Sequence, residues 1–150
     1  MTGLDTNILV YARRVEAPHH REALRLLRSL AEGPRPWALP WPCVYEFLRI
    51  VTHPRVFQPP TDLDAALDDV DSLLASPTLS LLGEGPGHPA HLRRMAEAGR
   101  AAGNLAHDAH IAALLTEHGV REFLSADRDF ARFPGIRVRN PFGGRPDRQP

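Results

Sequence analysis

The sequence contains no lysine, and all eighteen of its Lys or Arg positions are arginine. This absence excludes chemistry that needs a lysine amine, such as Schiff-base formation or the phosphate-binding lysine of a P-loop. The one cysteine, Cys43, cannot form an internal disulfide, and its apolar helical setting predicts a small core residue. The formal net charge is zero, which argues against a basic protein that holds nucleic acid by bulk electrostatics.

Long apolar runs are also missing. No stretch approaches the length needed to span a membrane, and no basic, apolar leader with a small-residue cleavage site precedes the first predicted strand. We therefore expect a cytoplasmic protein with no membrane partner. A chain of 150 residues is long enough to bury one core without disulfides, so we expect a single domain.

Short strands and amphipathic helices alternate along the chain. Strands are predicted at 3–6, 36–40, 78–82, 122–126 and 136–142. Helices are predicted at 6–14, 19–32, 42–53, 63–74, 92–103 and 107–119, with a short one at 127–133 and a loop at 83–91. The alternation predicts a three-layer α/β/α domain with a central, mainly parallel sheet of about five strands, and ligands bound outside the carboxyl ends of those strands.

Four acidic residues fall where such a sheet brings distant segments to one edge. Asp5 and Asp127 follow strands, while Glu46 and Asp108 are predicted in the first turns of helices and can reach the same edge. Asp108 also heads an inward apolar stripe, an unusual place for an unpaired carboxylate. Carboxylates that converge resist ionisation near neutral pH unless a hard cation lies between them. The pattern predicts a Mg²⁺ or Mn²⁺ site able to hydrolyse phosphodiesters.

Each acid also has a purely structural alternative. Asp5 could cap the helix that follows it, but Thr6 and Asn7 are also able to fill that role, so we favour a functional role for Asp5. Asp127 is a natural N-cap for the short helix at 127–133, and Asp129 lies two residues further on. We rank Asp127 as the metal ligand and keep Asp129 as a possible one.

Other polar residues are given supporting roles or none. Ser125 is expected to hydrogen-bond to a carboxylate or to metal-bound water. The eight histidines include the close pairs His107 with His110 and His19 with His20. Neither pair has the spacing typical of zinc sites, so we expect surface histidines.

Four segments together resemble a known family. They are LDTNILVYA, WPCVYEFLRIVTHPRVF, GNLAHDAHIAALLTEHGV and FLSADRDFARFPGIRVRNPF. In this order and spacing they resemble a PIN-domain ribonuclease toxin of the VapC family, of the kind abundant in mycobacteria. The resemblance implies a PIN-like nuclease domain over residues 1–142, followed by a polar tail, residues 143–150, that we expect to be disordered.

The resemblance also implies a set of site residues. Asp129 stays a possible ligand because in some relatives the acid before the phenylalanine stands out, and Thr6 with Asn7 matches a polar pair that supports the metal shell. The residues that match the family's metal-binding and catalytic acids are Asp5, Glu46, Asp108 and Asp127. The candidate RNA contacts are Arg13, Arg14, Arg49, Arg128 and Arg132.

The implied activity is cleavage of cellular RNA with Mg²⁺ or Mn²⁺, which inhibits translation and growth unless a cognate VapB-like antitoxin binds. The implied assembly is a homodimer that forms larger complexes through the antitoxin. Two alternatives remain open from the sequence: a PIN-like module that binds RNA or protein without cutting, and a housekeeping PIN nuclease. A haloacid dehalogenase-like phosphatase is disfavoured, because Asn7 stands where its second aspartate would be and lysine is absent.

Overall fold

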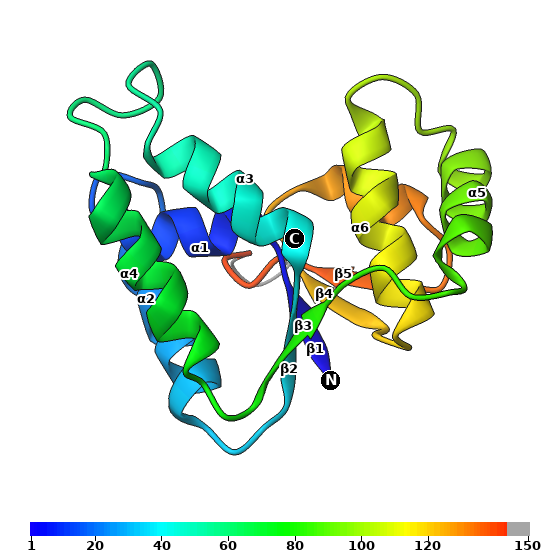
Figure 1. Ribbon diagram of the computed structural model, residues 1–150, viewed down its shortest axis with the longest axis horizontal. Coiled ribbons are helices and arrows are strands. Elements are labelled where there is room, and N and C mark those ends of the chain that lie inside the picture. Colours follow the sequence, from blue (N-terminus) through cyan, green and yellow to red (C-terminus); the bar gives the residue numbers. More distant parts are fainter. Residues whose placement is uncertain (144–150) are drawn as a thin grey trace, which may run out of the picture.

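The computed structural model describes residues 1–143, so nearly all of the predicted tail lies outside the described residues. Five strands form one sheet (Figure 1): β1 Thr2–Leu4, β2 Trp37–Pro40, β3 Leu79–Leu82, β4 Glu122–Leu124 and β5 Arg137–Arg139. The helices are α1 Thr6–Arg13, α2 His20–Glu32, α3 Trp41–Val51, α4 Leu63–Leu74, α5 His88–Gly99 and α6 Leu105–Glu117, with a 3₁₀ helix, η1, at Arg128–Arg132. The predicted α/β alternation is confirmed.

The sheet is parallel throughout, and β1 lies at its centre in the order β3-β2-β1-β4-β5. The chain runs outward from β1 to β2 and β3, then crosses back to place β4 on the other side of β1. The connections that leave β1 and β4 therefore diverge, and a crevice opens outside the carboxyl ends of these two strands. Both predicted strand-end acids, Asp5 and Asp127, lie at this point.

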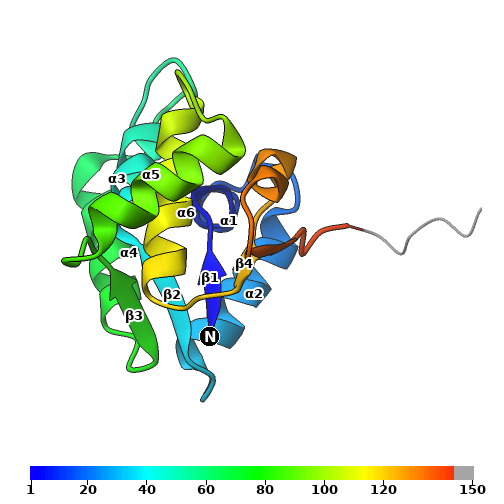
Figure 2. The same ribbon diagram turned by 90° about the vertical axis from the view of Figure 1, so that its right-hand side faces the viewer.

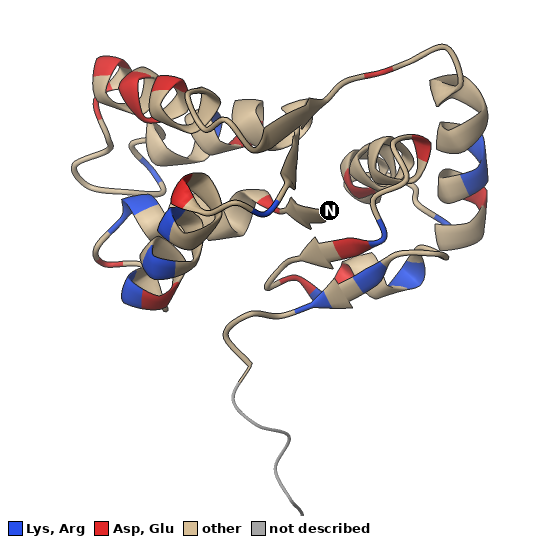
Figure 3. Cartoon of the chain, turned by 90° about the horizontal axis from the view of Figure 1, so that it is seen from below, with Lys and Arg blue, Asp and Glu red and all other residues tan. Residues whose placement is uncertain are grey.

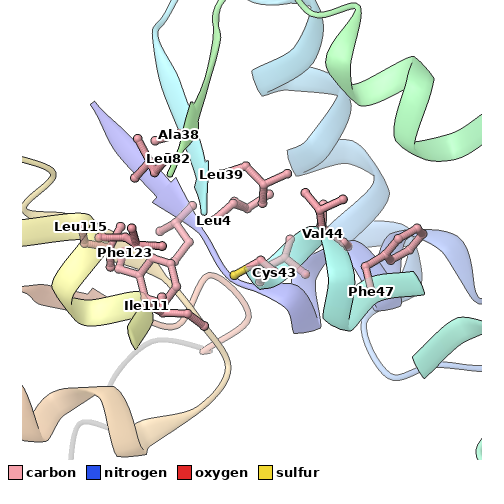
Figure 4. Packing of buried hydrophobic residues seen from close by; sticks show 14 of the residues in the cluster. Leu4, Ala38, Leu39, Cys43, Val44, Phe47, Leu82, Ile111, Leu115 and Phe123 are labelled. Carbon is pink, nitrogen blue, oxygen red and sulfur yellow. The ribbon is translucent and has the colours of Figure 1, made fainter. Parts of the chain in front are cut away.

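Helices cover both faces of the sheet. Figure 1 shows α1 to α4 on one side of the strands and α5 with α6 on the other, and Figure 2 shows α5 and α6 packed side by side. The core fills both interfaces: Val44 and Phe47 come from α3, whereas Ile111 and Leu115 come from α6 (Figure 4). Cys43 is fully buried in this core, as predicted. The three-layer α/β/α arrangement is confirmed.

Helix α5 differs from its prediction at both ends. It begins at His88, inside the predicted loop, because Pro89 occupies the first turn, where no intrahelical N–H bond is lost. It ends at Gly99 rather than Gly103, and Arg100 takes the left-handed conformation that closes the helix. Gly103 has positive φ and belongs to the turn between α5 and α6.

Charge is distributed unevenly over the helices. Half of the ten aspartates lie between Asp62 and Asp71, so they cap and line α4, while arginines line α2 (Figure 3). Asp69 of α4 forms a salt bridge of 2.9 Å with Arg13 of α1. Among the described residues, no helix has both the length and the apolar character to cross a membrane.

Candidate active site

Asp5 is held where β1 ends and α1 begins. Its carboxylate accepts hydrogen bonds from the Thr6 backbone N–H at 2.7 Å, the Ser125 hydroxyl at 2.6 Å and the Asn7 side-chain amide at 3.2 Å. Asp5 itself is thus the N-cap of α1, rather than Thr6 or Asn7, which the sequence left as competing candidates. The reason is geometric: Asp5 is the last residue with extended backbone before the helix, next to the first N–H groups that have no partner within the helix.

Ser125 and Asn7 connect the ends of β1 and β4. The Ser125 hydroxyl donates to Asp5 and accepts from the Asn7 amide at 3.3 Å and from the Asp127 backbone N–H at 2.9 Å. The Asn7 side-chain oxygen accepts from the Ala126 N–H at 3.2 Å. The predicted hydrogen bond from Ser125 to a carboxylate is confirmed. This network fixes the Asp5 carboxylate relative to the segment that carries Asp127.

Three further carboxylates meet beside this network. Oxygens of Asp108, Asp127 and Asp129 all lie within 4.8 Å of one another. Asp108 is in the first turn of α6, as predicted, and Asp127 caps η1 by accepting from the Asp129 N–H at 2.8 Å. Asp127, ranked as a ligand from the sequence, and Asp129, kept as a possible one, therefore both lie near Asp108.

Glu46 reaches the site from the opposite layer of helices. It lies in the second turn of α3 and not, as predicted, in the first. The helix begins at Trp41, directly after β2, one residue before Pro42, where the predicted helix starts. Its Oε2 accepts from His107 Nε2 at 2.5 Å and from the Thr6 hydroxyl at 3.4 Å. We did not assign His107 to the site from the sequence. The only local signal for it was its position next to Asp108.

Burial and charge repulsion set the ionisation of the cluster. Burial is the main cause that raises the pKa of Asp5 and of Asp108 to about 6, and the neighbouring carboxylates add to the shift. The hydrogen bond between Glu46 and His107 acts oppositely, since it lowers the pKa of Glu46 and raises the pKa of His107. Near neutral pH the site therefore holds anions that repel one another.

The acids surround one small cavity. Its volume is about 330 Å³, and its polar lining consists of Asp5, Thr6, Asn7, Glu46, Asp108 and Asp127. A larger groove of about 840 Å³ adjoins it, because Glu46 and Asp108 line both spaces. Trp41, Tyr45 and Arg49 also line the groove. The acids therefore face a space that an extended ligand can reach.

Two of the five candidate RNA-contact arginines are held by other groups. Arg13 pairs with Asp69 and lines a different cavity, away from the acids. Arg14 donates to the Thr61 hydroxyl at 3.0 Å, and its guanidinium lies 4.4 Å from the centre of the Phe57 ring. Phe57 lines the acid cavity and Arg14 does not, so Arg14 packs against a residue of the cavity wall.

The other three arginines lie closer to the acids. Arg49 is exposed on the groove, with its guanidinium 3.5 Å from Glu46. Arg128 is exposed at the start of η1. Arg132 donates to the Gly99 carbonyl at 3.1 Å, which ties η1 to the end of α5. Arg49 and Arg128 are thus better placed to meet a ligand.

The donor set fits a hard divalent cation. The acid cavity offers carboxylate oxygens from several segments, and within residues 1–143 no arginine forms a salt bridge with Asp5, Asp108 or Asp127. Mg²⁺ and Mn²⁺ prefer oxygen ligands and would offset the repulsion that raises the two aspartate pKa values.

Comparison with known proteins points to one family. The family model described as PIN domain matches residues 4–136. Ribonuclease VapC43 of Mycobacterium tuberculosis is 41% identical over 144 residues, which are 96% of this chain and 97% of that protein. Ribonuclease VapC48 of the same species is 36% identical over 140 residues, 93% of this chain and 97% of that protein.

Solved structures share the fold. VapBC2 from Rickettsia felis, bound to a DNA fragment from its promoter, aligns with a TM-score of 0.64 at 19% identity, over 93% of this chain and 97% of that one. Mycobacterium tuberculosis VapC20, a Sarcin-Ricin loop cleaving toxin, aligns with a TM-score of 0.66 at 14% identity, over 91% and 98%. Sequence and structure agree with the predicted resemblance, and the chain belongs to the PIN-domain family, among the VapC ribonucleases.

Proposed function

We propose that this chain is a metal-dependent endoribonuclease and the toxin of a VapBC-type pair, which cleaves cellular RNA and stops growth unless its antitoxin is bound. One observation carries the proposal: four acids from four separate segments line a single cavity at the crevice between β1 and β4. The VapC relatives support the choice of RNA as substrate. The proposed place of action is the cytoplasm.

The acids divide into two groups by their contacts. Asp5, Asp108 and Asp127 would hold Mg²⁺ or Mn²⁺, with Asp129 as a possible further ligand. When bound, the cation supplies charge neutralisation at the phosphate and an activated water. Glu46 keeps its charge through its hydrogen bond with His107, so its carboxylate is available to accept a proton beside the groove.

The groove supplies features that suit single-stranded RNA. Tyr45 is 67% exposed, and its ring centroid lies 6.0 Å from that of Trp41 on the groove wall. Exposed aromatic rings can stack on unpaired bases, and Arg49 can contact a phosphate. A strand in the groove would pass over Glu46 and Asp108, which line both spaces.

The proposed partners follow from the same site. A cognate VapB-like antitoxin that covers the groove would have to compensate the uncancelled carboxylates, so we expect it to insert a cationic side chain next to them. We also propose that the chain forms a homodimer, and that antitoxin joins dimers into larger assemblies. The solved VapBC2 complex, bound to promoter DNA, supports the antitoxin partner.

The test is cleavage of total cellular RNA by the purified chain with Mg²⁺, with Mn²⁺ and with a chelator. The Asp5→Asn and Asp108→Asn variants are run beside it, and Asp64→Asn, an exposed first-turn acid of α4, is the matched control. We expect metal-dependent fragments that each site variant reduces by more than about 100-fold, since losing even an outer partner of a metal ligand costs 10–100-fold.

The other outcomes are informative. RNA binding without cleavage under any metal would contradict the nuclease and favour the binding module. Cleavage that persists in both site variants would reveal a contaminating nuclease. Growth of cells that express the chain with and without its cognate VapB-like antitoxin separates a toxin from a housekeeping nuclease. Only the growth arrest caused by a toxin is relieved by that partner.

A further inference from the structure

A second cluster of metal-ligating side chains lies beside the groove, which two of its members, Glu84 and His110, line. Glu84 follows β3, His88 begins α5, and His110 lies on α6. One ligand atom from each residue lies within 4.8 Å of the other two. Glu84 Oε1 is 2.7 Å from His110 Nε2, and the two imidazole centroids are 5.2 Å apart. Figure 2 shows the two helices that carry the histidines packed together.

His88 supplies an independent observation. Its side chain is only 10% exposed, and its Nδ1 is buried without a hydrogen bond to any described residue. A buried, unsatisfied polar atom is costly, so its retention calls for a ligand or a partner. The carboxylate of Glu117 lies 3.4 Å away and is itself 11% exposed, although the geometry is not that of a hydrogen bond.

Glu117 is in turn anchored to the loop. Glu117 accepts a hydrogen bond from the backbone N–H of Gly85, in the loop between β3 and α5, at 3.3 Å. This loop lies so close to Glu117 that a Cβ on Gly85 would be 2.5 Å from Glu117 Oε1. A carboxylate that accepts the second N–H of an imidazole orients metal-bound histidines, and Glu117, 3.4 Å from His88 Nδ1, would take this role after a small shift. The cluster thus has three candidate ligands and an outer carboxylate.

We propose that Glu84, His88 and His110 bind one divalent transition-metal ion of the zinc class. Two imidazole nitrogens and one carboxylate oxygen are ligands that zinc prefers, with a fourth position left for water. Ligand atoms about 2.0–2.1 Å from a tetrahedral zinc lie roughly 3.3 Å apart. Separations of up to 4.8 Å would therefore close by at most about 1.5 Å, and the 2.7 Å between Glu84 Oε1 and His110 Nε2 would widen slightly. The acid cavity has oxygen donors alone and selects harder ions.

The two sites are distinct although α6 contributes to both. His110 follows Asp108 by two residues, and helical residues at that spacing do not face each other. An ion at the second site would join the loop after β3 to α5 and α6 and fix Glu84 and His110 on the groove wall. Because the ion binds the folded chain, it raises thermal stability. This proposal does not depend on RNA cleavage.

The test is calorimetric titration of the full chain with Zn²⁺ in excess Mg²⁺, which occupies the oxygen-only site. We expect one Zn²⁺ per chain and a rise in Tm, with affinity at least about 10-fold weaker in Glu84→Gln, His88→Gln and His110→Gln. His53→Gln, which removes a histidine at the far end of α3, is the matched control and keeps wild-type affinity.

Two results would overturn the proposal. One is wild-type protein without stoichiometric Zn²⁺ binding, or with binding that all three site variants retain. The other is loss of Zn²⁺ binding in Asp5→Asn, which would place the ion among the acids instead. Because His88 is buried and its variant can misfold, the decision rests on Glu84→Gln and His110→Gln, whose native side chains are 54% and 32% exposed.

Discussion

At the scale of single residues, the site depends on acids kept in an environment that opposes their charge. Asp5 is only 5% exposed, yet it accepts hydrogen bonds from Thr6, Asn7 and Ser125. These donors hold the carboxylate in place but do not cancel the effect of burial on its pKa. The fold therefore tolerates an ionised Asp5 at a cost that a bound cation can remove.

This cost predicts a pH dependence. The folded-state pKa of Asp5, about 6, is above its ordinary value of 3.8, so its contribution to stability is fully present below that ordinary value and is lost as pH rises through 6. For this buried group the loss is on the order of 3 kcal/mol. Asp108 shifts in the same direction.

Mg²⁺ should therefore raise Tm strongly at about pH 8 and hardly at all at about pH 5, where protons already occupy the site. Thermal unfolding with and without the ion across this range measures the difference. A gain in Tm that does not vary with pH would show that these two aspartates are not the groups that bind the ion.

The hydrogen bond between His107 and Glu46 predicts a second effect. His107→Ala removes the donor that lowers the pKa of Glu46, so we expect RNA cleavage to fall, and to fall more at acidic pH, where Glu46 takes up a proton, than at higher pH. His107→Gln can still donate an N–H and should retain more activity. The pH–rate profiles of the three proteins test this, and an unchanged profile in His107→Ala would rule out the proposed role.

At the scale of elements, the end of α5 controls how η1 is placed. Gly99 is buried against Phe133, and a Cβ on Gly99 would lie 2.5 Å from Phe133 Cε1. Arg132 also donates to the Gly99 carbonyl. Since η1 lies between Asp127 and Phe133, the packing of α5 sets the position of two candidate ligands.

Gly99→Ala should therefore destabilise the protein by about 1–3 kcal/mol through overpacking, although alanine is the better helix former. It should also weaken Mg²⁺ binding, because η1 must shift. Urea unfolding and metal titration measure the two effects. Ala98→Gly, at the exposed neighbouring position, is the control: it should cost about 1 kcal/mol and leave metal affinity unchanged. A more stable Gly99→Ala would contradict the packing argument.

At the scale of the whole molecule, a formal net charge of zero limits how the proposed RNA substrate would be held. Arg49 and Arg128 are exposed near the acids, whereas Arg13 is paired with Asp69. With about two phosphate contacts, the logarithm of RNA affinity should fall with the logarithm of salt with a slope of roughly −1.4.

The non-cleaving Asp5→Asn protein allows this slope to be measured by titration with labelled RNA at several salt concentrations. Adding Arg49→Gln should reduce the slope by about 0.7, and adding Arg13→Gln should leave it unchanged. A steep slope that survives Arg49→Gln and Arg128→Gln together would show that RNA is held elsewhere on the surface.

Local patterns were sufficient for most of the elements and for the acids. The helices predicted at 42–53 and 63–74 match α3 and α4 closely, because periodicity and capping signals act within a few residues of the backbone they shape. The start of α5 was mispredicted because glycine and proline at 83–91 favour a loop, although Pro89 also fits a first helical turn.

The sequence by itself determined the α/β alternation, the presence of four acids near strand ends and helix starts, and the family resemblance. Only the tertiary structure decided that Glu46 meets His107 across 61 residues, that Asp127 and Asp129 both lie within 4.8 Å of Asp108, and that the rings of His88 and His110 meet. These contacts join helices from different connections around the sheet. Their geometry depends on strand order and on the packing of both layers, and no local pattern of residues encodes either one.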